Sequence, residues 1–208
     1  MKKFLPVLLM LLVIFIAGQV FSQEMKATTE TGNEVVLYSN GTWEYNETDE
    51  VEISSEYTRP KSAQKHYKGE RGTYGIRLDD KLWKPATMVE GSDAEFEFDH
   101  VNGDGYAMII FERIEMNIDA LKEIALENAK SVSTNAKIVL EEKRIVNRTE
   151  ILCLQIEATI QSIEFVYYNY YYVGDTGTIQ LITFTGKNLF DEYKSDFENL
   201  LNGFEVYK

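Results

Sequence analysis

The segment from Phe165 to Thr185 constrains the fold more than any other part of the chain. It reads FVYYNYYYVGDTGTIQLITFT, two β-prone runs separated by the four residues from Gly174 to Gly177. Five of the 13 tyrosines of the chain lie in its first run. Runs rich in aromatic and β-branched residues around a short glycine-containing turn predict a β-hairpin. A hairpin this long and this apolar is expected at the centre of a sheet.

The residues on both sides of this hairpin show the periodicity of further strands and of two helices. Strands are predicted near 74–78, 94–98, 106–112, 137–146, 151–160 and 204–207. Asn117 is expected to cap a helix that ends near Ser133, with its apolar residues on one side. Asn188 is expected to cap a last helix, which a left-handed Gly203 would end.

The order of these elements predicts the fold class. Three strands, a helix, four strands, a helix and a strand follow one another over residues 73–208, and only the helices offer connections long enough for parallel crossovers. We therefore predict an α+β domain with a mostly antiparallel central sheet and two main helices packed on it.

The first 72 residues are predicted to contain three separate parts. Residues 1–22 carry two lysines, an apolar run and small or neutral residues at Val20 and Ser22, which is the layout of a signal peptide cleaved after Ser22. An uncleaved membrane anchor is the alternative, whereas a lipoprotein would need a cysteine at the cleavage point. Residues 23–45 include a β-hairpin around Asn40-Gly41, and residues 46–72 have the polar composition of a linker.

Charge and cysteine content exclude several classes of function. The net charge of −13 repels phosphate backbones and anionic lipid headgroups, so nucleic acid is a poor partner. The single cysteine, Cys153, excludes an intramolecular disulfide and a multi-cysteine zinc or iron–sulfur site. We expect an exported protein whose fold depends on packing and which holds no metal and no cofactor.

Three short motifs have a catalytic or metal-binding interpretation, and a structural one is favoured for each. Asp175-Thr176-Gly177 matches the aspartic-protease triplet, but it occurs once and at a turn. Residues 100–105 match half of a calcium loop, but His100 stands at the first ligand position. Cys153 would need a nearby base, and His66 and His100 are the two histidines of the chain. We predict no catalytic residue and no metal ligand.

One face of the tyrosine-rich run is the remaining candidate for a binding site. Tyr167, Asn169 and Tyr171 share one face of the strand. The polar Asn169 makes this face the better candidate for exposure to solvent. Tyrosine combines a large apolar area with a polar tip, so this face could bind a glycan, a peptide or a protein partner. The competing interpretation is that helices or loops cover both faces.

The main domain resembles the PsbP-like superfamily, which includes bacterial envelope proteins of the DcrB kind. The resemblance extends over about residues 73–207 and is carried by Tyr74-Gly75-Ile76 leading to Trp83, the helix near 118–133, the run ending in Tyr170-Tyr171-Tyr172, the return strand 180–185 and the closing 197–204 segment. It implies a central antiparallel sheet with helices on both sides, no enzymatic activity, and a role in binding or assembling envelope components.

These observations predict an exported, non-enzymatic binding or envelope-assembly protein of the periplasm or the extracellular space. Its partner would be an envelope protein or a glycan. Two alternatives stay open: a small-ligand carrier, which would need a closed apolar cavity, and a hydrolase that uses scattered carboxylates.

Overall fold

The structure is a computed structural model that describes residues 25–29, 34–45, 53–88 and 91–207. It divides into two compact units, Met1–Glu47 and Thr48–Lys208. The predicted signal peptide at 1–22 and the linker residues 46–52 lie outside the described residues. Within the part that is described, no helix is both long and apolar enough to cross a membrane.

The first unit contains a three-stranded antiparallel sheet. Its strands are β1 (Met25–Thr28), β2 (Glu34–Leu37) and β3 (Trp43–Tyr45), in the order β1-β2-β3. The predicted hairpin around Asn40-Gly41 is confirmed as the β2–β3 pair, and β1 adds a strand that the sequence analysis did not predict. Gly41 has a φ of 82°, and Asn40 Oδ1 accepts a hydrogen bond of 2.9 Å from the Thr42 backbone N–H.

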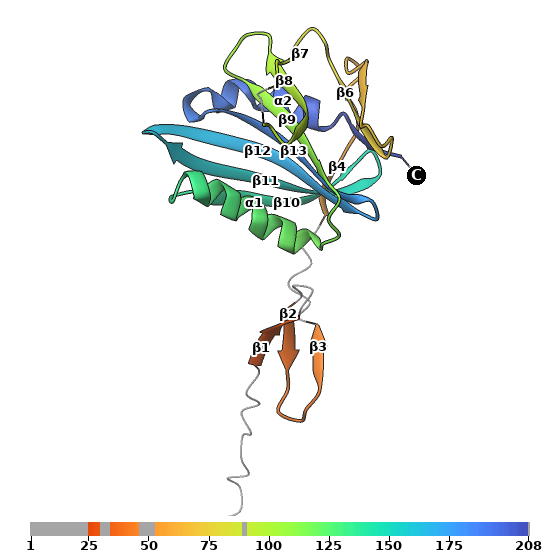
Figure 1. Ribbon diagram of the computed structural model, residues 1–208, viewed down its shortest axis with the longest axis vertical. Helices are drawn as coiled ribbons and strands as arrows, with labels where there is room; N and C mark the ends of the chain where they lie inside the picture. Colours follow the sequence, from red (N-terminus) through yellow and green to blue (C-terminus); the bar gives the residue numbers. More distant parts are fainter. Residues whose placement is uncertain (1–24, 30–33, 46–52, 89–90, 208) are drawn as a thin grey trace, which may run out of the picture. The chain divides into compact units, whose positions relative to one another are not determined.

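The second unit is built on an eight-stranded sheet (Figure 1). Its order is β4-β10-β11-β12-β13-β9-β8-β7. The strands are β4 (Ile53–Tyr57), β7 (Trp83–Pro85), β8 (Ala94–His100), β9 (Tyr106–Glu112), β10 (Lys137–Val146), β11 (Thr149–Ile160), β12 (Ile163–Gly174) and β13 (Gly177–Gly186). The β4–β10 pair is parallel and the other pairs are antiparallel. The predicted fold class is thereby confirmed, with β12 and β13 in the middle of the sheet.

The β12–β13 turn is tight because Gly174 pairs with Gly177, which leaves Asp175 and Thr176 as its two central residues. Gly177 has a φ of 134°, and a Cβ there would lie 2.1 Å from the carbonyl oxygen of Glu112. Only glycine permits this backbone conformation and this close approach. The turn is therefore held directly against the end of β9.

The two helices cover opposite faces of the sheet (Figure 1). α1 (Ile118–Val132) begins as predicted, because the Asn117 side chain accepts a hydrogen bond of 2.7 Å from the Ala120 N–H. It buries Leu121 and Ala125 against β11 and β12. On the other face, α2 (Phe190–Leu201) buries a second set of side chains: Phe190, Tyr193, Phe197, Leu200 and Leu201.

Both predicted ends of α2 differ from the structure. A 3₁₀ turn, η1 (Lys187–Leu189), precedes the helix, and the residue at its N-cap is Leu189 instead of Asn188. Gly203 does not have a positive φ. A Cβ at Gly203 would lie 1.7 Å from the carbonyl oxygen of Arg77, so glycine is needed there for close approach rather than for a left-handed turn.

A small second sheet lies on the α2 side of the domain. It contains β14 (Phe204–Val206), β6 (Tyr74–Leu78) and β5 (Lys65–Lys68), in the order β14-β6-β5. Tyr74, Ile76 and Phe204 belong to the same core as Phe197 of α2.

The prediction of a polar linker over 46–72 is wrong where the structure describes these residues. β4 extends the main sheet and β5 pairs with β6, so both belong to the domain. Each forms only one strand pair, at the edge of its sheet, and an edge strand needs few apolar residues. In β5, which reads Lys-His-Tyr-Lys, only Tyr67 turns toward the core. The alternation that identifies a strand is therefore missing.

Candidate functional site

The tyrosine face predicted as a binding platform is covered by α1. Asn169 and Tyr171 are each 2% exposed, and Tyr171 packs in the core that Leu121 of α1 completes. Asn169 is satisfied internally, because its Nδ2 donates to the Tyr171 hydroxyl (2.9 Å) and its Oδ1 accepts from the Thr183 N–H (3.1 Å). Tyr167 is half-buried and stacks on Phe184. These three residues do not form an open surface.

The opposite face of the same strand holds a buried polar network under α2. Arg144 is 3% exposed, and its Nη1 donates to the Tyr170 hydroxyl (3.1 Å), which donates to Asn202 Oδ1 (2.9 Å). Next to it, the Tyr168 hydroxyl donates to Glu198 Oε1 (2.7 Å). The network connects β10, β12 and the end of α2, so its role is to fix the helix on the sheet.

Cys153 lies beside this network and is not arranged as a nucleophile. It is fully buried, and desolvation raises the pKa of its thiol to about 12, although the charge of Arg144 acts in the opposite direction. A thiol with so high a pKa stays protonated at neutral pH, and the thiolate is the reactive form. Cys153 is therefore a packing residue.

The histidine and aspartate motifs have structural roles. His100 is 3% exposed and packs between the rings of Trp83 and Tyr193, with its Nε2 3.2 Å from Asp196 Oδ2. Asp175 and Thr176 form the β12–β13 turn. Among the residues that the structure describes, no three His, Cys, Asp or Glu side chains come close enough to hold a metal ion.

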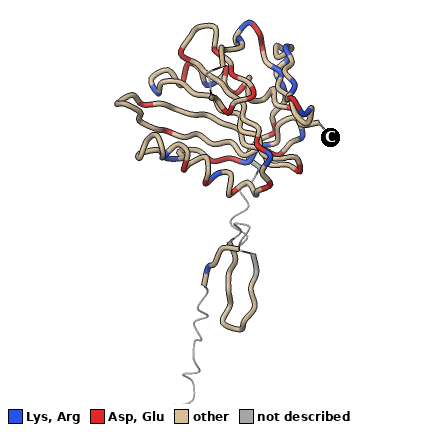
Figure 2. Tube along the Cα trace, viewed as in Figure 1, with Lys and Arg blue, Asp and Glu red and all other residues tan. Residues whose placement is uncertain are grey.

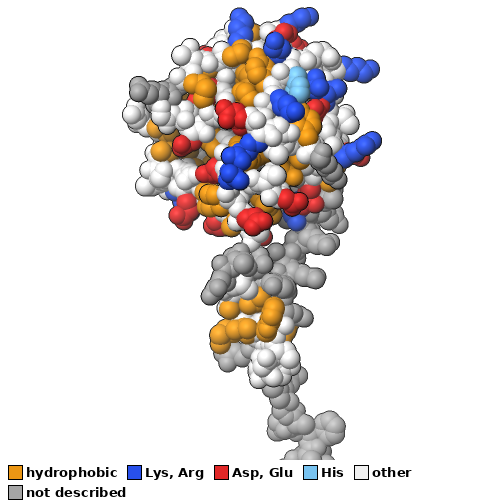
Figure 3. Space-filling view, turned by 45° about the vertical axis from the view of Figure 1, so that its right-hand side comes forward, with side chains coloured by type: hydrophobic (Ala, Val, Ile, Leu, Met, Phe, Trp, Pro, Cys, Tyr) orange, Lys and Arg blue, Asp and Glu red, His pale blue; other side chains and the backbone are white. Residues whose placement is uncertain are grey.

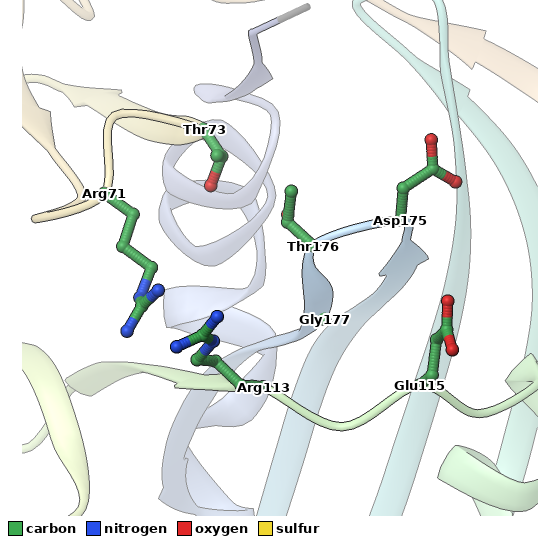
Figure 4. Close-up of a pocket in the computed structure, with 7 residues that line it drawn as sticks. All are labelled: Arg71, Thr73, Arg113, Glu115, Asp175, Thr176 and Gly177. Atoms are coloured by element: carbon green, nitrogen blue, oxygen red, sulfur yellow. The ribbon is translucent and has the colours of Figure 1, made fainter.

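One open pocket brings charged groups together from three segments (Figure 4). It has a volume of about 490 Å³ and lies between the turn before β6, the segment after β9 and the β12–β13 turn. Arg71 and Arg113 line one side, whereas Glu115 and Asp175 line the other, with Thr176 between them. The volume is within the range of small-ligand sites. This pocket was not predictable from the sequence, since no local pattern joins residues from three distant segments.

Positive charge is concentrated on the small sheet and its flanks (Figures 2 and 3). Residues 59–84 contain eight of the 21 Lys and Arg residues against three acids, a net charge of +5 in a chain of −13. We call the part formed by Arg59, Lys61, Lys65, His66, Lys68 and Arg77 the basic surface. Arg59 and Arg77 both pair with Glu205 of β14, whereas Lys61, Lys65 and Lys68 are exposed. A charge count over a sliding window of the sequence would have revealed this segment.

Comparison with solved structures identifies the architecture. Cyanobacterial PsbP (CyanoP) from Synechocystis sp. PCC 6803 is similar over 71% of this chain and 95% of its own, with a TM-score of 0.56 and 14% identity. The domain has a PsbP-like fold. The Ran-binding protein Mog1p of Saccharomyces cerevisiae is similar over 68% of this chain and 94% of its own, with a TM-score of 0.50 and 9% identity. No protein-family model and no curated protein matches the sequence. At these identities the likeness concerns the fold alone.

Proposed function

We propose that this protein is exported and acts as a non-enzymatic binding or envelope-assembly module, whose partner docks on the basic surface. The PsbP-like fold supports a binding role, since the similar Mog1p is itself a Ran-binding protein. The N-terminal residues 1–22 support export, with a signal peptide cleaved after Ser22. The concentration of positive charge on an acidic chain is the observation that carries the proposal.

The chemistry of the basic surface defines the partner that fits it. His66 and Arg77 are directly paired across β5 and β6, and Lys68 lies on the same strand as His66. Glu205 pairs with Arg59 and Arg77. The exposed lysines of the basic surface therefore supply the positive charge that a partner would meet. An acidic patch on another envelope protein would complement them, and such complementarity sets orientation and association rate. The remaining surface is strongly negative and would repel that partner.

Photo-crosslinking in intact cells tests this proposal. A photoreactive residue replaces Lys65 on the basic surface, and the matched control replaces Lys130 on the exposed side of α1. We expect one dominant crosslinked envelope protein from position 65 and none from position 130. The same product from both positions, or from neither, would contradict the proposal.

A charge-reversal pair gives a second readout. Lys65→Glu combined with Lys68→Glu is expected to abolish the crosslink from a probe at His66, because two attractive charges become repulsive. Lys130→Glu combined with Lys137→Glu changes the net charge equally at exposed positions outside the basic surface and should leave the crosslink intact. Mass spectrometry of the exported chain tests export separately, with Gln23 as the expected first residue.

A further inference from the structure

The pocket next to the β12–β13 turn contains two positive groups, Arg71 and Arg113, on the side away from its carboxylates. Among the described residues, no carboxylate lies within ion-pair distance of Arg71 or Arg113. Arg71 instead contacts an aromatic ring, since its Cζ lies 5.7 Å from the centre of the Phe111 ring. Figure 4 shows both guanidinium groups reaching into the same side of the pocket. Two converging guanidinium groups are suited to a carboxylate or a phosphate.

The rest of the pocket distinguishes between these two anions. Glu115 and Asp175 lie beyond Thr176, on the side away from the arginines (Figure 4). The four charged side chains sum to zero, and a phosphate carrying two negative charges would gain from the arginines while the carboxylates repel it. A ligand with one carboxylate and one ammonium group meets an opposite charge at each end.

The backbone holds these two sides in a fixed relation. Gly177 brings the β12–β13 turn so close to β9 that a Cβ there would lie 3.2 Å from the Cα of Arg113. The strand pair Thr178–Glu112 adds the regular hydrogen bonds of β13 and β9. Asp175 and Arg113 are thus attached to adjoining backbone, and a pre-formed arrangement lowers the entropy that binding would cost.

A buried hydroxyl at the wall of the pocket is a further, independent observation. Thr73 Oγ1 is buried without a hydrogen-bond partner among the described residues, and Figure 4 shows it pointing into the pocket. An unsatisfied buried hydroxyl is uncommon and costs free energy, which a ligand oxygen at this position would recover.

We infer that this pocket binds a small zwitterion, either a free amino acid or a short peptide with both termini unblocked. Arg71 and Arg113 bind its carboxylate, and Asp175 and Glu115 bind its ammonium group. The hydroxyl of Thr73 donates to the carboxylate end. The exposed position of the pocket suits a ligand that exchanges with the surroundings.

Isothermal titration of the full chain tests this inference with alanine, Ala-Ala and Ala-Ala-Ala, which separate a free amino acid from peptides of two lengths. N-acetyl-Ala-Ala and Ala-Ala-amide each remove one terminal charge. We expect at least one unblocked probe to bind and each blocked form of Ala-Ala to bind about two- to fivefold more weakly, as the loss of an exposed ion pair predicts.

Variants assign the two ends of the ligand. Arg113→Gln should weaken the binding of Ala-Ala and reduce the difference between Ala-Ala and Ala-Ala-amide, because Arg71 alone then binds the carboxylate. Asp175→Asn, which keeps a good turn residue, should reduce the difference between Ala-Ala and its N-acetyl form, because Glu115 alone then binds the ammonium group. Lys84→Gln removes an exposed cation outside the pocket and should change nothing. The thermal unfolding temperature of each variant checks that it is folded.

Two results would overturn the inference. One is the absence of binding by all three unblocked probes at millimolar concentration. The other is tighter binding of inorganic phosphate than of any peptide, which would make the pocket a simple anion site.

Discussion

Arg144 lies under α2, where its guanidinium contacts three tyrosine rings and two carboxylates. Its Cζ is 4.7 Å from the centre of the Tyr57 ring and 5.6 Å and 5.7 Å from those of Tyr168 and Tyr170. Glu142 Oε2 accepts a hydrogen bond of 2.8 Å from its Nε. Without this cation, the carboxylates and the tyrosine hydroxyls would keep the desolvation cost of burial and lose their partner.

Arg144→Met is therefore expected to lower the free energy of unfolding by about 2 to 4 kcal/mol. This is slightly less than for a fully buried ion pair, because the side chains of Glu142 and Glu198 are 30% and 31% exposed. Urea denaturation measures the change. The exposed control Lys84→Met should stay within about 0.5 kcal/mol of the parent, and equal losses in both variants would contradict a special role for Arg144.

The raised pKa of Cys153, about 12, predicts a loss of stability at high pH. In the unfolded chain the thiol ionises near pH 8.5, whereas in the folded chain it keeps its proton to a much higher pH. The stabilisation from the buried neutral thiol is thus complete below about pH 8.5 and is lost as the pH rises toward 12.

Cys153→Ala removes this titration, so the stability difference between parent and variant should shrink by roughly 1 to 2 kcal/mol between pH 8 and pH 10. Urea denaturation at several pH values measures this difference in the free energy of unfolding. The contributions of lysines and tyrosines cancel in the difference, because these residues titrate in both proteins. A difference that stays constant over this range would show that the thiol ionises equally in both states.

For single residues, the sequence predicts the face of a strand on which a side chain lies better than it predicts whether another element buries that face. The alternation of a strand puts Cys153 on the face opposite Leu152 and Leu154, and in the structure Cys153 packs in a different core from these two leucines. Asn169 suggested a wet face, yet it forms its hydrogen bonds with a neighbouring strand and Tyr171. The importance of Arg144 was not predictable, because its partners lie on four separate elements.

Among the elements, α1 determines which surfaces of the sheet are closed. Its start at Asn117 follows from the sequence, whereas the strands it covers depend on packing. It contacts β10, β11 and β12. Tyr106, on β9, is 38% exposed on the same face, in a stack with Phe184 and Tyr167.

Leu121→Ala tests the contribution of α1. Leu121 is fully buried, so the cavity should lower the free energy of unfolding by about 2 to 5 kcal/mol, measured by thermal and urea denaturation. Ile124 is on the same helix but 39% exposed, and Ile124→Ala should cost about 1 kcal/mol or less. Similar losses in the free energy of unfolding for both variants would mean that α1 does not pack on the sheet through Leu121.

For the whole molecule, the fold class and the central position of 165–185 followed from the sequence, whereas the domain boundary did not. β4 and β5 have too few apolar residues to be recognised as strands. Yet Ala63 is 2% exposed, and the Tyr67 ring lies 4.9 Å from that of Phe98. Burial of this kind depends on segments that are distant in sequence.

Two truncated chains test whether the domain begins near residue 48 or near residue 73. The fragment 48–208 contains the whole second unit and should unfold cooperatively at nearly the temperature of the longer chain. The fragment 73–208 lacks β4 and β5 and should unfold at a markedly lower temperature or fail to fold, because β6 and β10 each lose a strand partner. Equal unfolding temperatures for the two fragments would restore the linker interpretation.

The β14-β6-β5 sheet also has a consequence for the order of folding. The hairpins from β10 to β13 are made of contacts that are close in sequence, whereas β6 reaches β14, and Arg77 reaches Glu205, across 128 residues. Long-range contacts of this kind form late, since closing a long loop costs entropy before any contact is gained. The core around Phe204 thus stays open until residues 190–206 have been synthesised. Under the export proposed above, a chain in this state would reach the membrane before its fold is complete.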